Sequence, residues 1–373
     1  MLEEETTVQR AKEFARDKVR PNIGRLEEDA EFRKDFFNQM ATEGMMTLSL
    51  HQAPDTFKVS TGEYLSVIRE LAKVDAGVAV AVSVTNMVVE AILNYGTEEQ
   101  CARIFPNVFN GKSAPACFAM TERSAGSDPK AIETFATPDS DGSFLLNGEK
   151  KFITNGDIAG VGIVIARLDD QLTAFLVDPQ REGWQLVKKE QKVGLLTINL
   201  VSLRLENYRV QKEDILGAPG EGLHIALSAL DNGRLGVAAQ AIGIAEAALE
   251  ASIHWAKARR QFGKALAEFE GVSFKIADMH LKIASAKALL MRAASRKEKG
   301  LPFTLEAAEA KLLASEACNF VTWEAMQIHG GYGYIRDYPL EKYWRDGRVT
   351  TIYEGTSEVM RLIISRALLG RGE

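Results

Sequence analysis

The sequence has few cysteines and histidines, and their spacing excludes several classes of protein. Its three cysteines, Cys101, Cys117 and Cys318, are widely spaced and form no CxxC pair, so neither a disulfide framework nor a cysteine-based zinc site is predicted. We expect buried thiols in a reducing compartment. The five histidines include no HExxH motif and no two that are three or four residues apart, which disfavours a histidine-based metal site.

Common nucleotide and nucleophile motifs are also missing. The sequence has no GxGxxG after a strand-like run, no GxxxxGKS or GxxxxGKT, and no GxSxG. These absences disfavour a Rossmann nicotinamide enzyme, a P-loop enzyme and an α/β-hydrolase.

Acidic residues only slightly outnumber basic ones. The chain has 45 basic and 51 acidic residues and a net charge of −6, which provides no global field to attract nucleic acid or an anionic membrane. The N-terminus lacks a basic segment followed by an apolar run, so we expect no secretory signal. The most apolar stretch, 77–93, is interrupted by polar residues and is too short and too polar for a membrane span, so it predicts a buried core helix. These features favour a soluble, cytoplasmic protein, or one of the mitochondrial matrix if the chain is a processed eukaryotic form.

The hydrophobic pattern divides the 373 residues into three parts. Residues 1–113 have apolar residues at helical spacing and predict an N-terminal helical domain. Residues 114–217 have strand-like runs separated by Asp, Pro and Gly, which predict a central β domain. Residues 218–373 return to helical spacing and predict a C-terminal helical domain. The predicted fold class is therefore α+β, in the order helices, strands, helices.

Caps and turns predict individual elements in the first two parts. Apolar spacing predicts helices over 63–74 and 78–95, and Thr97 is expected to cap a third helix. Asn147-Gly148 lies between two strand-like runs and predicts a hairpin turn. Further strands are expected over 161–166, 172–177, 184–187 and 201–206.

Two long helices are predicted in the last part. Gly300-Leu301-Pro302 is expected to end the first helix, and Thr304 is expected to cap the second, which runs to Gln327. Apolar residues spaced by four and three mark the buried face of the first helix: Val272, Ile276, Met279, Ile283, Ala286 and Leu290.

Three polar, glycine-rich segments are candidate ligand-binding elements. Met120–Asp128 combines small residues and hydroxyls that expose backbone N–H groups. Gln327–Tyr334 contains three glycines that would let the backbone approach a pyrophosphate. Ile352–Glu358 places a carboxylate between an aromatic residue and a glycine, as a general base in a dry pocket could be placed. Taken singly, the first segment is more typical of an ordinary loop and the third of a helix N-cap, whereas the second fits a helix C-cap equally well.

Together and in this order, the segments resemble the acyl-CoA dehydrogenase family of flavoproteins, in particular its short-chain and branched-chain members. Met120–Asp128 is similar to the family's first signature, and residues 327–346 are similar to the second. Arg259-Arg260-Gln261-Phe262-Gly263 resembles the flavin-contacting segment after the first long helix. The likeness covers nearly the whole chain and implies the family's fold: an N-terminal helical domain, a small β barrel and a C-terminal four-helix bundle.

The resemblance also implies a reaction. The family oxidises an acyl-CoA thioester to a trans-2-enoyl-CoA with FAD, as in β-oxidation and other fatty acid or branched-chain acyl-CoA metabolism. By its match to the family's Tyr-Glu-Gly-Thr segment, Glu354 is expected to take the α-proton while hydride passes to flavin N5. Because that proton is weakly acidic, the site must stabilise the developing enolate. Some members carry the base on the helix around residues 230–234, where this chain has Gly233, which cannot act as a base.

The expected ligand contacts follow residue by residue from the resemblance. Arg259, Gln261 and Phe262 match residues that reach the FAD pyrophosphate from a neighbouring subunit, a role that suits the bidentate Arg side chain. For Phe152 the alternative is a core aromatic residue of a strand. Residues that match acyl-CoA contacts are Ser127, Asp231, Arg234, Tyr353 and Gly355. The full set that matches FAD contacts is Phe118, Met120, Thr121, Gly126, Ser127, Phe152, Thr154, Arg259, Gln261, Phe262, Gln327, Gly330, Gly331, Thr356 and Glu358.

The resemblance implies an assembly and an electron acceptor as well. It implies a homotetramer that passes electrons to an electron-transferring flavoprotein. Two alternatives remain open: an acyl-CoA oxidase of the same fold that uses O₂, and a flavin-free acyl-CoA-binding or scaffold protein.

Four departures from the family's usual pattern leave the flavin and base motifs intact. Arg123 stands where Pro is usual, and Glu270 stands where a Gln often contacts the cofactor. Residues 48–54 replace the common Pro-x-x-Tyr-Gly-Gly region, and residues 194–199 are more apolar than usual. These departures bear on the choice of substrate and of electron acceptor.

Overall fold

The N-terminal part is a group of helices whose starts are set by side-chain caps. The computed structural model describes residues 6–48 and 59–370. Ser60 and Glu63 form a capping box at the start of α4, and Asp75 accepts a hydrogen bond from the backbone of Val78 at the start of α5. The helices are α1 (Thr7–Phe14), α2 (Ile23–Glu28), α3 (Ala30–Thr42), α4 (Thr61–Val74), α5 (Ala76–Tyr95) and α6 (Glu98–Phe109).

The helices predicted for this part are confirmed. α4 and α5 contain the ranges 63–74 and 78–95, and Thr97 caps α6 by accepting a hydrogen bond from the backbone N–H of Gln100 at 3.2 Å. The departure at residues 48–54 lies outside the described residues except for Leu48, which is buried.

The described residues of the middle part form an eight-stranded sheet. The strand order is β6-β7-β3-β2-β4-β5-β8, and β1 pairs in parallel with β4. The four strands expected beyond the supposed hairpin are confirmed as β4, β5, β6 and β7, whereas the short strands β1, β2 and β8 have no counterpart among the predicted ranges. The strands are β1 (Ala116–Ala119), β2 (Phe135–Pro138), β3 (Phe144–Thr154), β4 (Val161–Leu168), β5 (Gln171–Val177), β6 (Trp184–Lys189), β7 (Leu200–Val210) and β8 (Ile215–Leu216).

The hairpin predicted at Asn147-Gly148 is wrong. β3 is one continuous strand across this pair, and its pairing with β7 shifts register between Leu146 and Gly148. Gly148 has φ +149°, and a Cβ at this position would lie 2.5 Å from Thr134 Oγ1. The pair therefore marks a β-bulge where the strand passes close to another segment, a position that also favours glycine.

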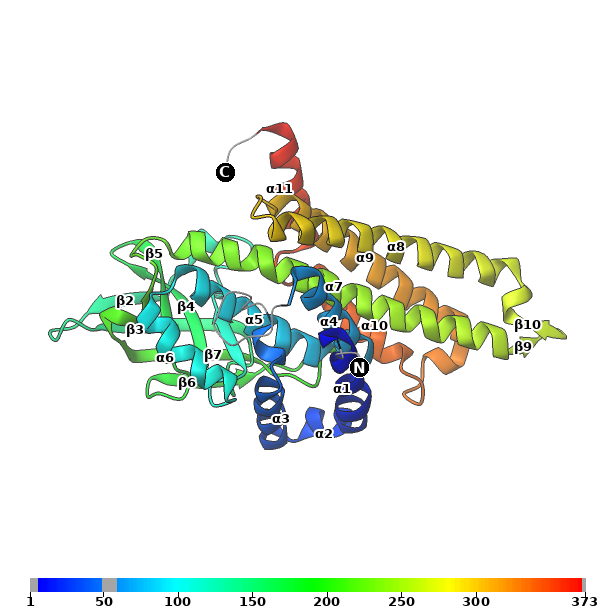
Figure 1. The fold of residues 1–373 in the computed structure, drawn as a ribbon, viewed down its shortest axis with the longest axis horizontal. Helices are drawn as coiled ribbons and strands as arrows, with labels where there is room; N and C mark the ends of the chain where they lie inside the picture. The colour runs from blue at the N-terminus through cyan, green and yellow to red at the C-terminus, as the bar shows by residue number, and fades with distance from the viewer. Residues whose placement is uncertain (1–5, 49–58, 371–373) are drawn as a thin grey trace, which may run out of the picture.

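Three long helices dominate the C-terminal part. α7 packs against α8 and α9, and also against α4 and α5 of the N-terminal part. In Figure 1 the sheet and the small β9–β10 hairpin lie at opposite ends of the long axis of the molecule. The elements are α7 (Gly222–Ala258), β9 (Arg260–Gln261), β10 (Lys264–Ala265), α8 (Glu270–Glu298), α9 (Thr304–His329), α10 (Leu340–Arg348) and α11 (Ser357–Leu369).

The prediction for these long helices is correct except at one cap. α8 ends at Glu298, before Gly300, and the last four of its six predicted face residues are buried while the first two are partly buried. Thr304 does not cap α9: it is the first helical residue, and its hydroxyl donates to Asp231 Oδ2 at 2.6 Å. The hydroxyl is used for a contact with α7 instead.

Two helices among the described residues, α5 and α7, are long and apolar enough to cross a membrane by length and composition alone. Their most apolar windows are 83% and 78% buried within the protein. The stretch 77–93 is therefore a core helix as predicted, although α5 is longer and more apolar than that prediction assumed.

A buried ionic cluster ties the three parts of the chain together. Lys342 Nζ on α10 lies 2.8 Å from Asp75 Oδ2 and 2.5 Å from Asp346 Oδ2. The backbone N–H of Leu195 donates to Asp346 at 2.6 Å, and the Thr197 hydroxyl donates to Asp75 at 2.5 Å. The apolar character of residues 194–199 fits this position, because the loop is packed against the junction rather than exposed.

Candidate active site

A strained turn between α10 and α11 carries Glu354. Glu354 has φ +53° and Gly355 has φ +93°, so two consecutive residues adopt the left-handed conformation. A non-glycine residue in this conformation persists only when its surroundings hold it, and such residues cluster at functional sites. Thr356 then caps α11 by accepting a hydrogen bond from the backbone of Val359 at 3.3 Å.

One oxygen of the Glu354 carboxylate is shielded from solvent, although the residue as a whole is partly exposed. Its Oε2 atom is buried and has no hydrogen-bond partner among the described residues. An ideal Cβ on Gly233 would lie 2.6 Å from Oε2 and 2.9 Å from Met87 Sδ, so the carboxylate occupies the space that a larger residue 233 would need. Burial raises the pKa of Glu354 to about 7, against the opposing effect of Arg234 and Lys311. A carboxylate with these properties is suited to accept a proton near neutral pH.

Four of the five predicted acyl-CoA contacts lie in or beside this turn, namely Asp231, Arg234, Tyr353 and Gly355. Arg234 Nε donates to the carbonyl oxygen of Glu354 at 3.4 Å, and its Nη1 donates to Asp231 Oδ1 at 2.5 Å. The hydroxyl of Tyr353 donates to Gln240 on α7. Glu358 is exposed in the first turn of α11. The structure thus brings Asp231, Arg234 and the 353–358 segment together.

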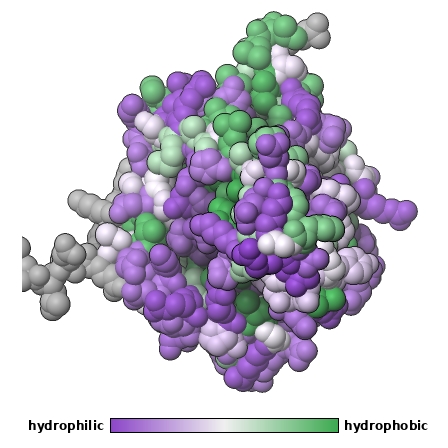
Figure 2. Space-filling view, turned by 90° about the vertical axis from the view of Figure 1, so that its right-hand side faces the viewer, coloured by the Kyte–Doolittle hydropathy of each residue, from purple (hydrophilic) through white to green (hydrophobic). Residues whose placement is uncertain are grey.

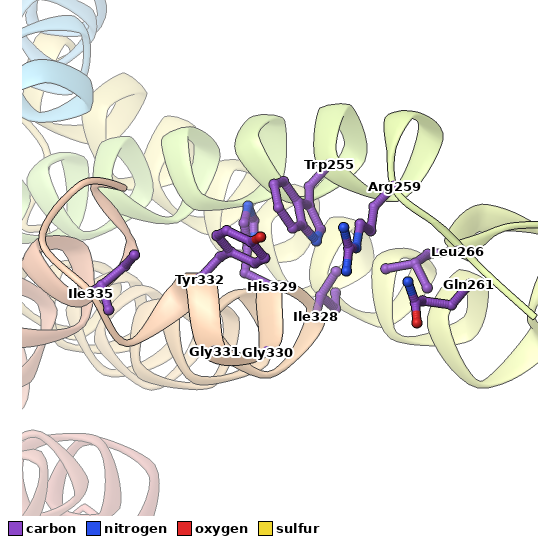
Figure 3. A pocket seen from close by; sticks show the side chains of 10 residues that line it. All are labelled: Trp255, Arg259, Gln261, Leu266, Ile328, His329, Gly330, Gly331, Tyr332 and Ile335. Carbon is purple, nitrogen blue, oxygen red and sulfur yellow. The ribbon is translucent and has the colours of Figure 1, made fainter.

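A separate cleft of about 490 Å³ opens near the β9–β10 end of α7 (Figure 3). Four predicted FAD contacts line it, namely Arg259, Gln261, Gly330 and Gly331. Phe262 is 94% exposed and does not line the cleft, and neither does the exposed Gln327. The remaining lining residues are Ile328, His329, Tyr332 and Ile335, which lie in the predicted 327–346 segment but were not named as contacts, and Trp255 and Leu266, which no predicted segment contains.

The chemistry of this cleft fits the diphosphate and an aromatic ring of FAD. Arg259 is a cation at its edge, 5.6 Å from the centre of the Tyr332 ring. Ideal Cβ atoms on Gly330 and Gly331 would meet no described atom within 4 Å, so the backbone at these glycines is open to a close approach. The Trp255 and His329 rings stack at 5.0 Å and form an aromatic wall. Arginine, bare backbone and aromatic rings are suitable partners for a phosphate and a ring system.

A second group of predicted FAD contacts lies in the β domain. Phe118 belongs to β1, Met120 and Thr121 follow it directly, and Phe152 and Thr154 lie at the end of β3. The backbone N–H of Lys151 donates to the carbonyl of Thr121 at 2.8 Å, which joins the two segments. Phe152 has φ +59° and is 59% exposed, so it is not a core aromatic residue of this chain. Gly126 and Ser127 are exposed in the loop that follows β1.

The second group is held by a buried ion pair that the sequence reading missed. Lys150 Nζ is 2.7 Å from Glu122 Oε1 and donates to the carbonyl of Met120 at 3.1 Å. Glu122 also accepts from the Thr134 hydroxyl at 2.5 Å. The sequence offers no clear signal for this pair, because Lys150 is one of two adjacent lysines in the strand and only the fold buries its side chain.

One chain does not bring the two groups of predicted FAD contacts together. The cleft lining contains no described residue of the β domain, and in Figure 1 the sheet as a whole and the β9–β10 end of α7 lie toward opposite ends of the molecule. No group of three or more His, Cys, Asp or Glu within residues 6–48 and 59–370 is placed to hold a metal ion.

Comparisons with known proteins agree with this architecture. Family models of the acyl-CoA dehydrogenase N-terminal, middle and C-terminal domains match residues 2–112, 117–208 and 220–369. A short-chain specific acyl-CoA dehydrogenase of Megasphaera elsdenii is 39% identical over 368 residues, which cover 96% of each chain. The CarC subunit of the caffeyl-CoA reductase-Etf complex of Acetobacterium woodii is also 39% identical, over 369 residues and 96% of each chain.

A solved structure shows the same fold. The butyryl-CoA dehydrogenase of Megasphaera elsdenii has a TM-score of 0.91 and 38% sequence identity, covering 99% of this chain and 100% of that one. Because the likeness extends over all three parts of the chain, the protein belongs to the acyl-CoA dehydrogenase family of oxidoreductases.

Proposed function

We propose that the protein catalyses the FAD-dependent α,β-dehydrogenation of an acyl-CoA thioester to a trans-2-enoyl-CoA, with Glu354 as the base that takes the α-proton. One observation carries the proposal: the Glu354 carboxylate has a buried oxygen without a hydrogen-bond partner among the described residues, and its pKa is raised to about 7. Such a base is ionised to a useful extent at neutral pH and still binds a proton strongly.

Each side chain near the turn then has a task. Glu354 Oε2 receives the α-proton, and the backbone N–H of Glu354 is expected to donate to the thioester oxygen and stabilise the enolate. Arg234 and Asp231 would hold the acyl-CoA beside the turn. Bound FAD would supply the acceptor for the β-hydrogen, which leaves as hydride. Gly233 and Met87 pack beside the carboxylate, and the bound acyl group is expected to exclude water from the proton transfer.

We propose FAD as the cofactor, as members of this family depend on FAD. The separation of the two contact groups supports a homo-oligomer, proposed as a homotetramer, in which a neighbouring subunit completes each site. Figure 2 shows the end of the molecule that carries β9–β10, where apolar residues lie among polar ones. Large exposed apolar side chains on the elements near this end, which an interface would cover, are Phe262, Phe274, Trp323 and Tyr334.

We further propose an electron-transferring flavoprotein as the electron partner, because the Acetobacterium relative is named as a subunit of a reductase-Etf complex. The same relative favours a second candidate, the reduction of an enoyl-CoA by the same site. Dehydrogenation leaves Glu354 protonated, and the same protonated carboxyl group would donate the proton when an enoyl-CoA is reduced. The two functions are distinguished by comparing the rate of acyl-CoA oxidation with oxidised flavoprotein partner and the rate of enoyl-CoA reduction with reduced partner. The bacterial relatives support a place in cytoplasmic acyl-CoA metabolism, such as β-oxidation.

The test is anaerobic reduction of the FAD-loaded protein by a panel of straight and branched acyl-CoA thioesters. We expect the flavin to bleach with the preferred thioester. Glu354→Gln keeps the shape of the side chain but removes its basicity, so bleaching should slow by at least about 10²-fold while acyl-CoA still binds. Glu250→Gln, on the exposed face of α7, is the control and should bleach at the wild-type rate. A Glu354→Gln variant as fast as the wild type would show that another group is the base.

A further inference from the structure

Lys311 is a fully buried lysine on α9, directly beside the turn that carries Glu354. Its side chain has 0% exposure, and its Nζ donates to the carbonyl oxygen of Gly355 at 2.5 Å. A buried ammonium group is costly unless it is hydrogen-bonded or paired, so a lysine on this apolar face requires a reason. The neighbouring buried residues on α9 are small: Ala307, Ala308, Ala310 and Ala314.

Two cations hold two consecutive carbonyl groups of the strained turn. Arg234 from α7 donates to the carbonyl of Glu354, and Lys311 from α9 donates to the carbonyl of Gly355. Both residues of the turn have positive φ, which for Glu354 is a conformation that the chain alone disfavours. The two helices therefore hold the turn from two sides, and the contact from Lys311 is the shorter of the two.

The surrounding charges also favour an ionised base. Burial lowers the pKa of Lys311 to about 8, an effect that Glu354 and Glu358 oppose and Arg234 reinforces. The cations that face Glu354 are Arg234 and Lys311, and both lower its pKa against the effect of burial. The other titratable groups nearby are Tyr64 on α4, Tyr353 in the turn, and Glu90 on α5, which faces Tyr64. Burial raises the pKa of both tyrosines, so these remain neutral.

We propose that Lys311 is a positioning residue that fixes the Glu354 turn for proton abstraction by anchoring the carbonyl of Gly355. This inference rests on the proposed role of Glu354 as the base. The inference explains why a costly ammonium group is buried here. The same group holds the backbone of the turn and lies near the carboxylate that must be ionised.

The experiment compares full-length, FAD-loaded wild type with Lys311→Met and Lys311→Arg. Anaerobic stopped-flow reduction by butanoyl-CoA is recorded from pH 5.5 to 9. For Lys311→Met we expect the plateau rate to fall at least about tenfold. At low pH the rate falls as Glu354 becomes protonated, and this part of the pH profile is the acid limb. In Lys311→Met the acid limb should move to higher pH by about one unit, because a neutral side chain neither anchors the turn nor favours ionised Glu354. Lys311→Arg keeps the charge and a donor and should return the acid limb to its wild-type position.

A second readout separates proton abstraction from flavin reduction. Acetyl-CoA has α-protons but no β-carbon, so exchange of its α-protons in D₂O, followed by mass spectrometry, reports on the base alone. Lys311→Met should slow this exchange in parallel with flavin reduction. If Lys311→Met does not fold, Lys311→Gln, which is neutral but retains a donor, should still shift the acid limb upward.

Lys342→Met is the matched control, because Lys342 is also a largely buried lysine in an ionic cluster but does not contact the turn. It should lower thermal stability and leave the acid limb in place. The proposal is overturned if the neutral Lys311 variants keep the wild-type acid limb, or if Lys342→Met shifts it equally. A wild type that neither bleaches nor exchanges α-protons with any thioester would instead overturn the proposed function.

Discussion

The charged groups of the Glu354 turn are enclosed by the chain's own helices, whereas those of the cleft near Arg259 lie at an open end of the molecule. Arg234 and Lys311 are 4% and 0% exposed, and both contact backbone of the turn. In the cleft Gln261 is exposed, and the adjacent Phe262 is 94% exposed. The first region is organised within one chain before a ligand arrives. The second offers suitable groups but no enclosure, and we infer that a second subunit provides it.

The largest effect is expected from filling the space beside Glu354. Gly233→Ala would place a methyl group 2.6 Å from Glu354 Oε2 and 2.9 Å from Met87 Sδ. Because the carboxylate must move, we expect flavin reduction to slow by about 10²-fold, with FAD binding unchanged. Stopped-flow bleaching and a fluorescence titration measure the two quantities. Gly271→Ala is the control, since its Cβ would meet no described atom within 4 Å. A fast Gly233→Ala variant would contradict the closed character of this region.

A smaller effect, of a different kind, is expected in the cleft. Arg259→Ala removes a charged hydrogen-bond donor, typically worth about 1.5–3 kcal/mol, so FAD should bind roughly 10- to 100-fold more weakly. The pH profile of flavin reduction at saturating FAD should not change. Arg260→Ala is the matched control, because the Arg260 guanidinium contacts only the carbonyl of Gly263 in the described hydrogen bonds. Equal losses in both variants would indicate a general effect of charge rather than a contact in the cleft.

The smallest effect concerns stability and distinguishes the regions by pH. The folded-state pKa of Glu354, about 7, lies above its ordinary value of 4.5, so the folded protein favours the protonated form. Below the ordinary value the side chain is protonated in both states and costs nothing. As the pH rises through 7, the burial of a charge destabilises the fold.

Glu354→Gln should therefore raise the melting temperature by a few degrees at pH 8, corresponding to about 1–3 kcal/mol, and change it little near pH 4.5. Calorimetry at both pH values measures the difference. Arg259→Ala should show no such pH dependence, since Arg259 is only partly buried, at the edge of an open cleft. A Glu354→Gln variant that is no more stable at pH 8 would contradict the buried-charge account of the turn.

Local signals predicted much of the fold because caps and apolar spacing act over a few residues. Thr97 begins its helix as its side chain dictates, and the buried face of α8 follows from spacing. Asn147-Gly148 misled the prediction because the same pair suits a hairpin turn and a bulge. Only the close approach of Thr134, distant in sequence, selects the bulge. Thr304 was likewise assigned as a cap because its contact with α7 is a tertiary one.

Sequence motifs identified some residues of the candidate site, but they did not identify residues that reach the site only through packing of the fold. Glu354 was selected through its segment, but its shielding depends on Gly233 and Met87, which meet it only in the fold. Lys311 was missed although a signal existed: it shares a helix face with Ala307 and Ala314, where a charge is unexpected. The sequence alone does not tell that this side chain reaches the carbonyl of Gly355.

The length of helix α7 sets the distance between the two regions. Arg234 lies beside the Glu354 turn, and Arg259 follows the last residue of the same helix, so at 1.5 Å per residue the helix separates them by about 38 Å. Inserting one residue between them would advance the distal end by about 1.5 Å and rotate it by about 100° relative to the turn. We expect this stretch of α7 to tolerate exchanges of side chains far better than any change of length.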